Sequence, residues 1–242
     1  MQIDFAAREL TIKLVYYGPA LSGKTTNLQS LHELSADDTR GRLMTLETRD
    51  DRTLFFDLLP LSFKGAGGFS LRLKLFTVPG QVIHASTRRL VLQGADGVAF
   101  IADSQITETV NNATAFRDLK ANLKANGVEL GQMPLVIQFN KRDLPGIRTD
   151  EEIAEQAKRG KEPVFTAIAT RNEGTLETFV GLLYLTWRAL ERHHELSKKF
   201  RIDGEAFLGD VAQRFGRRDV RDMLKLARTA EGRELVKEGA TP

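Results

Sequence analysis

Residues 11–34 read TIKLVYYGPALSGKTTNLQSLHEL, and this stretch decides the fold. TIKLVYY is rich in β-branched and aromatic side chains, which is typical of a strand. LQSLHEL has the apolar spacing of a helix. Between them stands GPALSGKT, Gly18 to Thr25, which matches the pattern G-x-x-x-x-G-K-[ST] in the strand–loop–helix context that the pattern requires. We therefore predict a phosphate-binding loop that joins a strand to a helix.

The chemistry of such a loop is specific. Backbone N–H groups point at the phosphates from a helix N-terminus, where the helix dipole favours anions. Lys24 would reach the β- and γ-phosphates of a nucleotide, and the hydroxyl of Thr25 would bind Mg²⁺. The predicted phosphate-binding residues are Gly18, Ala20, Leu21, Ser22, Gly23, Lys24, Thr25, Thr26 and, from a later loop, Gly80.

Further strand patterns alternate with helical ones along the chain. Residues 53–60 and 70–77 are strand-like, and the glycines between them suit a hairpin turn. Short apolar runs, typical of parallel strands buried on both faces, follow at 97–103, 134–140 and 163–169. Helices are predicted at about 108–126, 150–159 and 175–196, and the polar residues 35–52 are predicted as loop. This order predicts an α/β fold with a six-stranded, mostly parallel sheet, one antiparallel edge strand and flanking helices.

The last part of the chain has a different character. The formal net charge of the whole chain is +3, and residues 196–242 carry the same excess of basic over acidic side chains. We predict one domain over residues 1–195 and a basic, helical C-terminal extension over 196–242. Its apolar residues form two helical faces, Phe207, Leu208, Val211 and Phe215 on one, and Val220, Met223, Leu224 and Ala227 on the other.

Two interpretations of the extension stay open. Its apolar faces either pack on the domain in cis, or dock on a partner or an anionic surface to which the basic residues add salt-dependent attraction. Membrane insertion is disfavoured because the polar faces mix acidic and basic residues. Nucleic-acid binding is disfavoured because no aromatic residues interleave with a basic stripe.

Composition excludes several classes of protein. There is no cysteine, which excludes disulfides and cysteine-ligated zinc, and the four histidines do not have a metal-ligand spacing. No apolar run approaches the roughly 18 residues of a membrane span, so no integral membrane segment is expected. The start, MQIDFAARELTIK, lacks the features of a secretory signal, and we expect a cytoplasmic protein.

The stretch FNKRD, residues 139–143, indicates which base the site takes. It follows an apolar strand, so Asn140, Lys141 and Asp143 would lie at the carboxyl edge of the sheet, where α/β sheets bind ligands. The carboxylate of Asp143 can accept from both N1–H and N2–H₂ of guanine, and adenine does not offer this pair of donors. The stem of Lys141 can lie over the purine, Asn140 can tie this loop to the phosphate loop, and Ala169 could give its N–H to guanine O6.

These motifs resemble those of Ras-like small GTPases, and most closely the MglA-type GTPases of bacterial gliding motility and cell polarity. The resemblance is carried by VYYGPALSGKTTNLQ, DRTLFFDLLPL, TVPGQV, ADSQI and NKRDLP, and it spans about residues 1–195. It implies a Ras-like P-loop GTPase fold, with Mg²⁺ as cofactor and GTP and GDP as substrate and product. It also implies polarity or motility effectors, a roadblock-type GTPase-activating homodimer, and a cytoplasmic location concentrated at the cell poles.

Within this resemblance, Thr77 in TVPGQ stands where most Ras-like proteins have an aspartate that helps to hold magnesium. The resemblance makes this threonine a trait of MglA-type proteins. Mg²⁺ would then be coordinated by the side-chain oxygens of Thr25 and Thr53, with phosphate oxygens and waters completing an octahedron. Asp57 either acts through a metal-bound water or is a solvated strand residue, and Asp103 is predicted to be a structural hydrogen-bonding residue.

Hydrolysis of GTP needs an oriented water and stabilised charge in the transition state. Gln81 follows Gly80, whose N–H could meet the γ-phosphate, and is predicted to orient the water. The resemblance implies that Arg52 is an arginine finger supplied in cis, with Arg49 as its competitor. Slow turnover without an activator follows as a hypothesis. The alternative is a nucleotide-bound scaffold with negligible hydrolysis, while NKRD disfavours an ATPase or a kinase.

Overall fold

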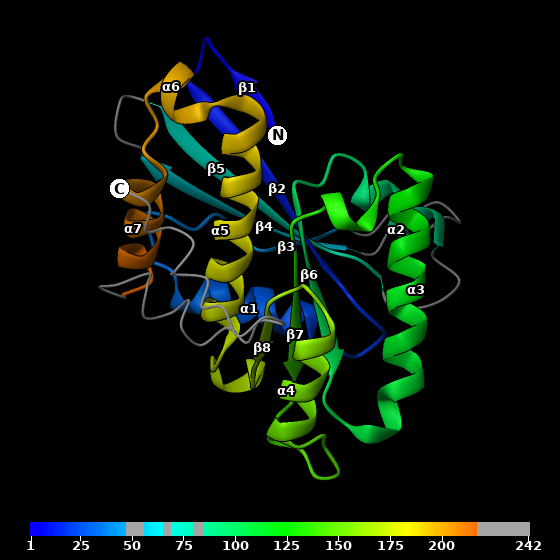
Figure 1. Cartoon of the computed structure of the whole chain (residues 1–242). Helices are drawn as coiled ribbons and strands as arrows, with labels where there is room; N and C mark the ends of the chain where they lie inside the picture. The colour runs from blue at the N-terminus through cyan, green and yellow to red at the C-terminus, as the bar shows by residue number, and fades with distance from the viewer. Residues whose placement is uncertain (47–55, 65–68, 80–84, 217–242) are drawn as a thin grey trace.

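The computed structural model describes residues 1–46, 56–64, 69–79 and 85–216, and Figure 1 shows their arrangement. Several predicted site residues lie outside these ranges: Gly80, Gln81, Thr53, Arg52 and its competitor Arg49. The second apolar face predicted for the extension, from Val220 to Ala227, also lies outside them.

The described strands form a single eight-stranded sheet. Its order is β3-β4-β5-β2-β6-β7-β8, and β1 pairs with β2 beside this path. Pairing is parallel from β5 through β2, β6 and β7 to β8, whereas β4 is antiparallel to both β3 and β5. The strands are β1 (Gln2–Asp4), β2 (Glu9–Tyr17), β3 (Met44–Leu46), β4 (Phe56–Lys64), β5 (Ser70–Thr77), β6 (Gly97–Asp103), β7 (Leu135–Asn140) and β8 (Val164–Thr166). The predicted α/β class with a mostly parallel sheet is confirmed.

The sheet has two strands more than the six predicted. β1 and β3 are three residues long, too short to show a period-two pattern, and β3 lies inside residues 35–52, which were predicted as loop. Because β3 pairs outside β4, the antiparallel strand of the predicted hairpin is not the edge of the sheet.

Helices cover both faces of the sheet (Figure 1). They are α1 (Lys24–Leu34), α2 (Ala85–Leu92), α3 (Thr109–Ala125), α4 (Asp150–Arg159), α5 (Thr175–His194), α6 (Leu196–Phe200) and α7 (Gly204–Arg214). One core lies under α1, α5, α6 and α7, and the other lies under α2, α3 and α4. Short 3₁₀ turns at Ile106–Glu108, Leu130–Gln132 and Ala169–Arg171 complete the regular structure.

Local sequence explains why these elements form where they do. Every residue of β6 is buried, which fits its uninterrupted apolar run GVAFIA and a position in the middle of the sheet. The helix α4 begins with a capping box, in which the side chains of Thr149 and Glu152 each accept from the other residue's backbone N–H. Both features position the loops that follow β6 and precede α4.

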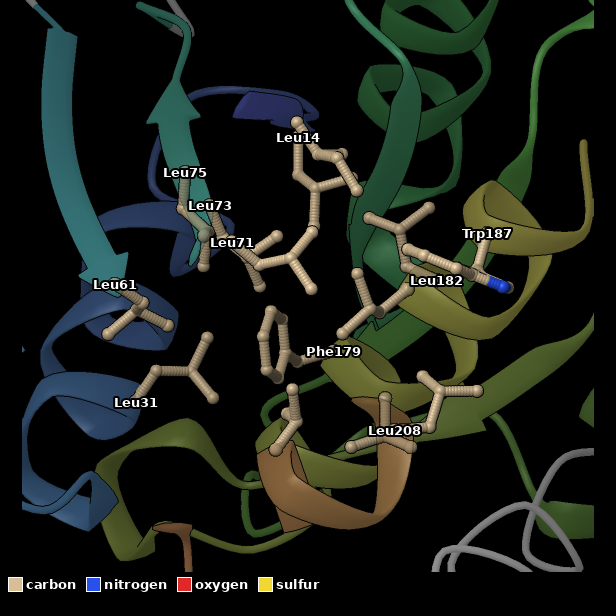
Figure 2. Packing of buried hydrophobic residues seen from close by; sticks show 14 of the residues in the cluster. Leu14, Leu31, Leu61, Leu71, Leu73, Leu75, Phe179, Leu182, Trp187 and Leu208 are labelled. Atoms are coloured by element: carbon tan, nitrogen blue, oxygen red, sulfur yellow. The ribbon is translucent and has the colours of Figure 1, made fainter. Parts of the chain in front are cut away.

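The described part of the extension packs on the rest of the chain in cis. The four residues of its first predicted apolar face, Phe207, Leu208, Val211 and Phe215, are buried in the same core as α1 and α5. Figure 2 shows Leu208 of α7 below Phe179 of α5. For residues 196–216 this confirms the first of the two interpretations.

Candidate nucleotide-binding site

The phosphate loop runs from the end of β2 to the start of α1. Gly18 has φ 152°, and a Cβ at this position would lie 2.2 Å from the carbonyl oxygen of Ile101. Gly23 is in the left-handed region with φ 92°, and a Cβ there would lie 2.2 Å from Nδ2 of Asn140. Both glycines of the motif are therefore required by close neighbours as well as by backbone conformation.

Lys24 is the first residue of α1, and its side chain folds back over the loop. Its ammonium donates to the carbonyl oxygens of Gly18 (3.1 Å) and Pro19 (2.6 Å). The pKa of Lys24 is lowered to about 8: burial is the main cause, the charge of Arg88 adds to it, and the charge of Asp57 opposes both effects. No carboxylate among the described residues forms an ion pair with this buried cation. A phosphate group would supply the missing negative charge.

Asp57 of β4 is a central acceptor beside the phosphate loop. Its Oδ2 accepts from the hydroxyls of Thr25 (2.5 Å) and Thr77 (2.9 Å), and its Oδ1 accepts from the hydroxyl of Thr45 (2.9 Å). The Asp57 backbone N–H also donates to Oγ1 of Thr77 at 2.8 Å. Only 6% of Asp57 is exposed, which excludes the interpretation as a solvated strand residue.

Thr77, which replaces the aspartate of most Ras-like proteins, thus hydrogen-bonds the carboxylate of Asp57 on the neighbouring strand. In the β4–β5 pairing Leu58 lies opposite Phe76, so Asp57 is beside Thr77 at the adjoining position. The threonine hydroxyl directs the neighbouring carboxylate towards Thr25, the predicted magnesium ligand. Among the described residues no group of three or more His, Asp or Glu side chains could hold a metal alone, so a cation here would also need phosphate oxygens or water.

The end of β7 lies against the phosphate loop. Nδ2 of Asn140 donates to the carbonyl oxygen of Ser22 at 2.9 Å, the tie between the two motifs that the sequence predicted. Oδ1 of Asn140 accepts the backbone N–H of Ala169 at 3.1 Å. The N–H that we expected to meet guanine O6 therefore already has an acceptor inside the protein.

Lys141 and Asp143, in the residues that follow β7, have different surroundings. Lys141 has φ 65°, and its ammonium pairs with Oδ2 of Asp103 at 2.7 Å. Oδ1 of Asp103 accepts the backbone N–H of Gln105 at 3.0 Å, which agrees with the structural role predicted for Asp103. Asp143 is exposed, so its carboxylate is accessible to a base.

A second polar cluster beside the site was not predicted from the sequence. Arg88 of α2 is 6% exposed, and its Nε donates to Oδ2 of Asp118 at 2.7 Å. The hydroxyl of Tyr17 also donates to Asp118, and Nδ2 of Asn122 donates to Tyr17 at 3.1 Å. Burial and the bond to Asp118 raise the pKa of Tyr17, which keeps the phenol protonated. The cluster joins α2 and α3 to the last residue of β2, directly before the phosphate loop.

A phosphate loop after β2, an antiparallel β4 and an NKRD loop tied to the phosphate loop define the class of Ras-like small GTPases. Over 190 residues the chain is 44% identical to the mutual gliding-motility protein MglA of Myxococcus xanthus (strain DK1622), a match that covers 97% of that protein and 78% of this chain. The chain belongs to the family of MglA-type small GTPases. No protein-family model matches it. Of the helices that the structure describes, none has the length and apolarity needed to cross a membrane.

Proposed function

We propose that the protein is a molecular switch that binds and hydrolyses GTP, and that controls cell polarity or motility through effectors bound in the GTP state. The observation that carries this proposal is the side chain of Asn140, which bonds Ser22 of the phosphate loop and Ala169 at once. It brings the predicted phosphate and base motifs to one edge of the sheet. The Myxococcus relative, named for gliding motility, supports the cellular role.

At the phosphate end, the buried ammonium of Lys24 would neutralise the β- and γ-phosphates. Mg²⁺ fits the hydroxyl of Thr25 and the carboxylate of Asp57, because it prefers hard oxygen donors and retains several waters. We assign Thr25 as a direct ligand, Asp57 as an acceptor from a metal-bound water, and Thr53, outside the described residues, as a second ligand. When bound, the ion would neutralise charge that develops on the phosphates.

At the base end, the exposed carboxylate of Asp143 would accept from N1–H and N2–H₂ of guanine. The stem of Lys141 would cover the purine face while its ammonium stays paired with Asp103. The N–H of Ala169 would be shared between Asn140 and guanine O6.

Hydrolysis is assigned to Gln81, which would orient the water, and to Arg52, which would stabilise charge in the transition state, with Arg49 as the competitor. Turnover would be slow until a roadblock-type homodimer positions the segments that carry Gln81 and Arg52. Contacts of these segments with the γ-phosphate would make effector binding depend on GTP. We place the protein in the cytoplasm, concentrated at the cell poles, with no nucleic-acid partner.

The base assignment is tested with Asp143→Asn. The amide can donate to the 2-carbonyl of xanthine but loses the paired acceptance of guanine, so GDP binding should weaken while xanthosine diphosphate binding appears. Glu155→Gln, an exposed carboxylate on α4, is the matched control and should bind GDP as the wild type does. Unchanged GDP affinity in Asp143→Asn would reject the guanine assignment.

Hydrolysis is tested by γ-phosphate release with and without a roadblock-type homodimer. Gln81→Leu and Arg52→Ala should each bind GTP but lose stimulated release, since an arginine finger contributes roughly 10³–10⁵-fold in rate in GTPases. Full stimulation in Arg52→Ala with loss in Arg49→Ala would move the role to Arg49. Bound GTP that is not hydrolysed under any of these conditions would instead favour the scaffold.

A further inference from the structure

The C-terminal end of α7 contacts the segment that leads from α1 to β3. The backbone N–H of Ala36 donates to the carbonyl oxygen of Arg214 at 3.0 Å. The guanidinium of Arg214 pairs with the carboxylate of Asp38 in the same segment. Phe215 anchors this end of α7, because its side chain is buried and its ring lies 5.6 Å from that of Phe179 in α5.

The same segment is bonded on its other side to β4. The N–H of Ser62 donates to the carbonyl oxygen of Thr39 at 2.8 Å, and the N–H of Gly41 donates to that of Pro60 at 2.9 Å. Residues 36–41 therefore lie between α7 and β4 and are hydrogen-bonded to both. We call residues 36–41 the bridging segment.

Both continuations of the bridging segment reach the nucleotide site. Along the chain it continues into β3, where the hydroxyl of Thr45 donates to Oδ1 of Asp57 at 2.9 Å. Across the sheet it holds β4 at Pro60, three residues beyond Asp57 in the same strand. A shift of the bridging segment would move the carboxylate of Asp57 relative to the hydroxyl of Thr25 on α1.

We propose that Arg214 and Phe215 are positioning residues for the nucleotide site. By fixing the bridging segment, the end of α7 holds Asp57 against Thr25 and slows the release of Mg²⁺ and GDP. This inference rests on the proposed function, because it assigns a task to the extension in the same GTPase cycle. The exposed ion pair with Asp38 contributes little by itself, so most of the restraint comes from burial of Phe215 and from the backbone bond to Ala36.

The test compares Phe215→Ala with Leu208→Ala in the full-length chain. Both residues are 5% exposed and lie in the same core, but Leu208 is six residues before Arg214, or about 9 Å along α7. Release of a fluorescent GDP is measured over a range of Mg²⁺ concentrations. Amide hydrogen exchange of residues 36–41 is measured without nucleotide.

Phe215→Ala should release GDP faster by roughly fivefold or more, the lower end of typical coupling between two sites. It should also need more Mg²⁺ to slow release, and the bridging segment should exchange faster. Leu208→Ala should stay close to the wild type in all three measurements. Arg214→Ala, which leaves the core intact, should show the same changes to a smaller degree, and Arg214→Lys should reverse them by restoring the charge pair with Asp38.

Three results would overturn the inference: wild-type release and exchange in Phe215→Ala, equal acceleration in Phe215→Ala and Leu208→Ala, or faster release without faster exchange in residues 36–41. If Phe215→Ala does not fold, Phe215→Leu, which keeps an apolar side chain but removes the ring contact with Phe179, decides by the same criteria. A wild-type protein that binds no GDP would overturn the proposed function and this inference together. Hydrogen exchange of residues 36–41 needs no nucleotide, so it would still show whether the end of α7 restrains the bridging segment.

Discussion

At the scale of single residues, the carboxylate of Asp57 and the hydroxyl of Thr77 form one unit on two neighbouring strands. The threonine bonds both the backbone N–H and Oδ2 of Asp57, so it fixes the strand position and the side-chain direction together. An aspartate at position 77 would put a second negative charge against the first. Threonine at this position is therefore the partner that a carboxylate on β4 requires.

We predict that Asp57→Asn raises the Mg²⁺ concentration needed to slow GDP release by roughly 10–100-fold, the usual effect of removing an outer-shell partner of a metal. Thr77→Asp alone should also impair binding, because two carboxylates so close repel each other. The double variant Asp57→Asn/Thr77→Asp restores a single carboxylate and should recover most of the Mg²⁺ response. A double variant no better than Asp57→Asn would show that the position of the carboxylate, and not its presence, is decisive.

The ionisation of Lys24 gives a second prediction. Its pKa is lowered to about 8, chiefly by burial, and bound phosphate would raise it again by adding a negative neighbour. At pH 8 about half of the free protein carries neutral Lys24, so GDP binding should take up about half a proton, and far less at pH 7. Affinity should fall as pH rises through 8.

Proton uptake is measured by titration calorimetry in buffers of different ionisation enthalpy. Lys24→Arg is the control, because a guanidinium stays charged at both pH values and should remove the difference between them. Equal uptake by the wild type at pH 7 and pH 8 would contradict the assignment of Lys24 to the phosphates.

The two kinds of site residue differ in how far the sequence predicts them. Asn140 belongs to a motif with fixed spacing, so its bond to the phosphate loop could be predicted from the sequence. The contact of Lys24 with phosphates stays a prediction. Asp57 could be identified as a candidate from the sequence, but its role stayed open, because that role depends on the register of β4 on β5. Arg88 and Asp118 could not be named, since they come from two helices and meet through packing that no local spacing encodes.

At the scale of elements, length decides what the sequence reveals. β6 and β7 are apolar runs of seven and six residues, neither is an edge strand, and they were predicted within a residue at each end. β3 contributes three residues that depend on pairing with β4, and its own sequence MTL carries no period. The short α2 follows the same rule, because its eight residues mix apolar and basic side chains too briefly to fix a helical face.

Two glycines of α7 provide a matched test of its packing. A Cβ on Gly204, the first residue of the helix, would lie 2.0 Å from Nε1 of Trp187, whereas a Cβ on Gly209 would meet nothing within 4 Å. Gly204→Ala should destabilise the protein by about 1–3 kcal/mol through overpacking. Gly209→Ala should stabilise it by roughly 0.5–1 kcal/mol, because alanine is the better helix former.

Urea unfolding of the two variants, followed by the fluorescence of Trp187, measures both effects. Trp187 is the one tryptophan of the chain and packs against Phe207 of α7 with ring centroids 5.0 Å apart, so its signal reports on this contact. Destabilisation by both substitutions, or by neither, would mean that the packing of α7 on Trp187 is not as described.

At the scale of the whole molecule, the described part of the extension, residues 196–216, forms part of the hydrophobic core under α1 and α5. Phe207 meets Phe63 of β4 and Trp187 of α5, and Phe215 meets Phe179 of α5. The match with the Myxococcus protein covers nearly all of that protein but 78% of this chain, and the remainder is similar in length to residues 196–242. The division of the chain at residue 195 stays a prediction, and truncation tests it.

We predict that a chain ending at Glu195 unfolds at a lower temperature than the full chain, even with GDP bound. Removal of residues 196–242 exposes the apolar side chains on which Phe207, Leu208, Val211 and Phe215 pack. Burial of one such side chain contributes about 1.5–3 kcal/mol, so the loss should exceed ~4 kcal/mol. For a chain of this size that corresponds to a fall in melting temperature of roughly 10 °C.

A chain ending at Gly216 is the matched control, because it keeps α6, α7 and Phe215, and it should melt near the full-length value. If the shorter chain melts with the full-length protein but loses an effector or its place in the cell, the extension is a docking site for a partner. If both truncated chains melt equally low, residues 217–242 carry the stabilisation, and the packing of α7 on α5 does not.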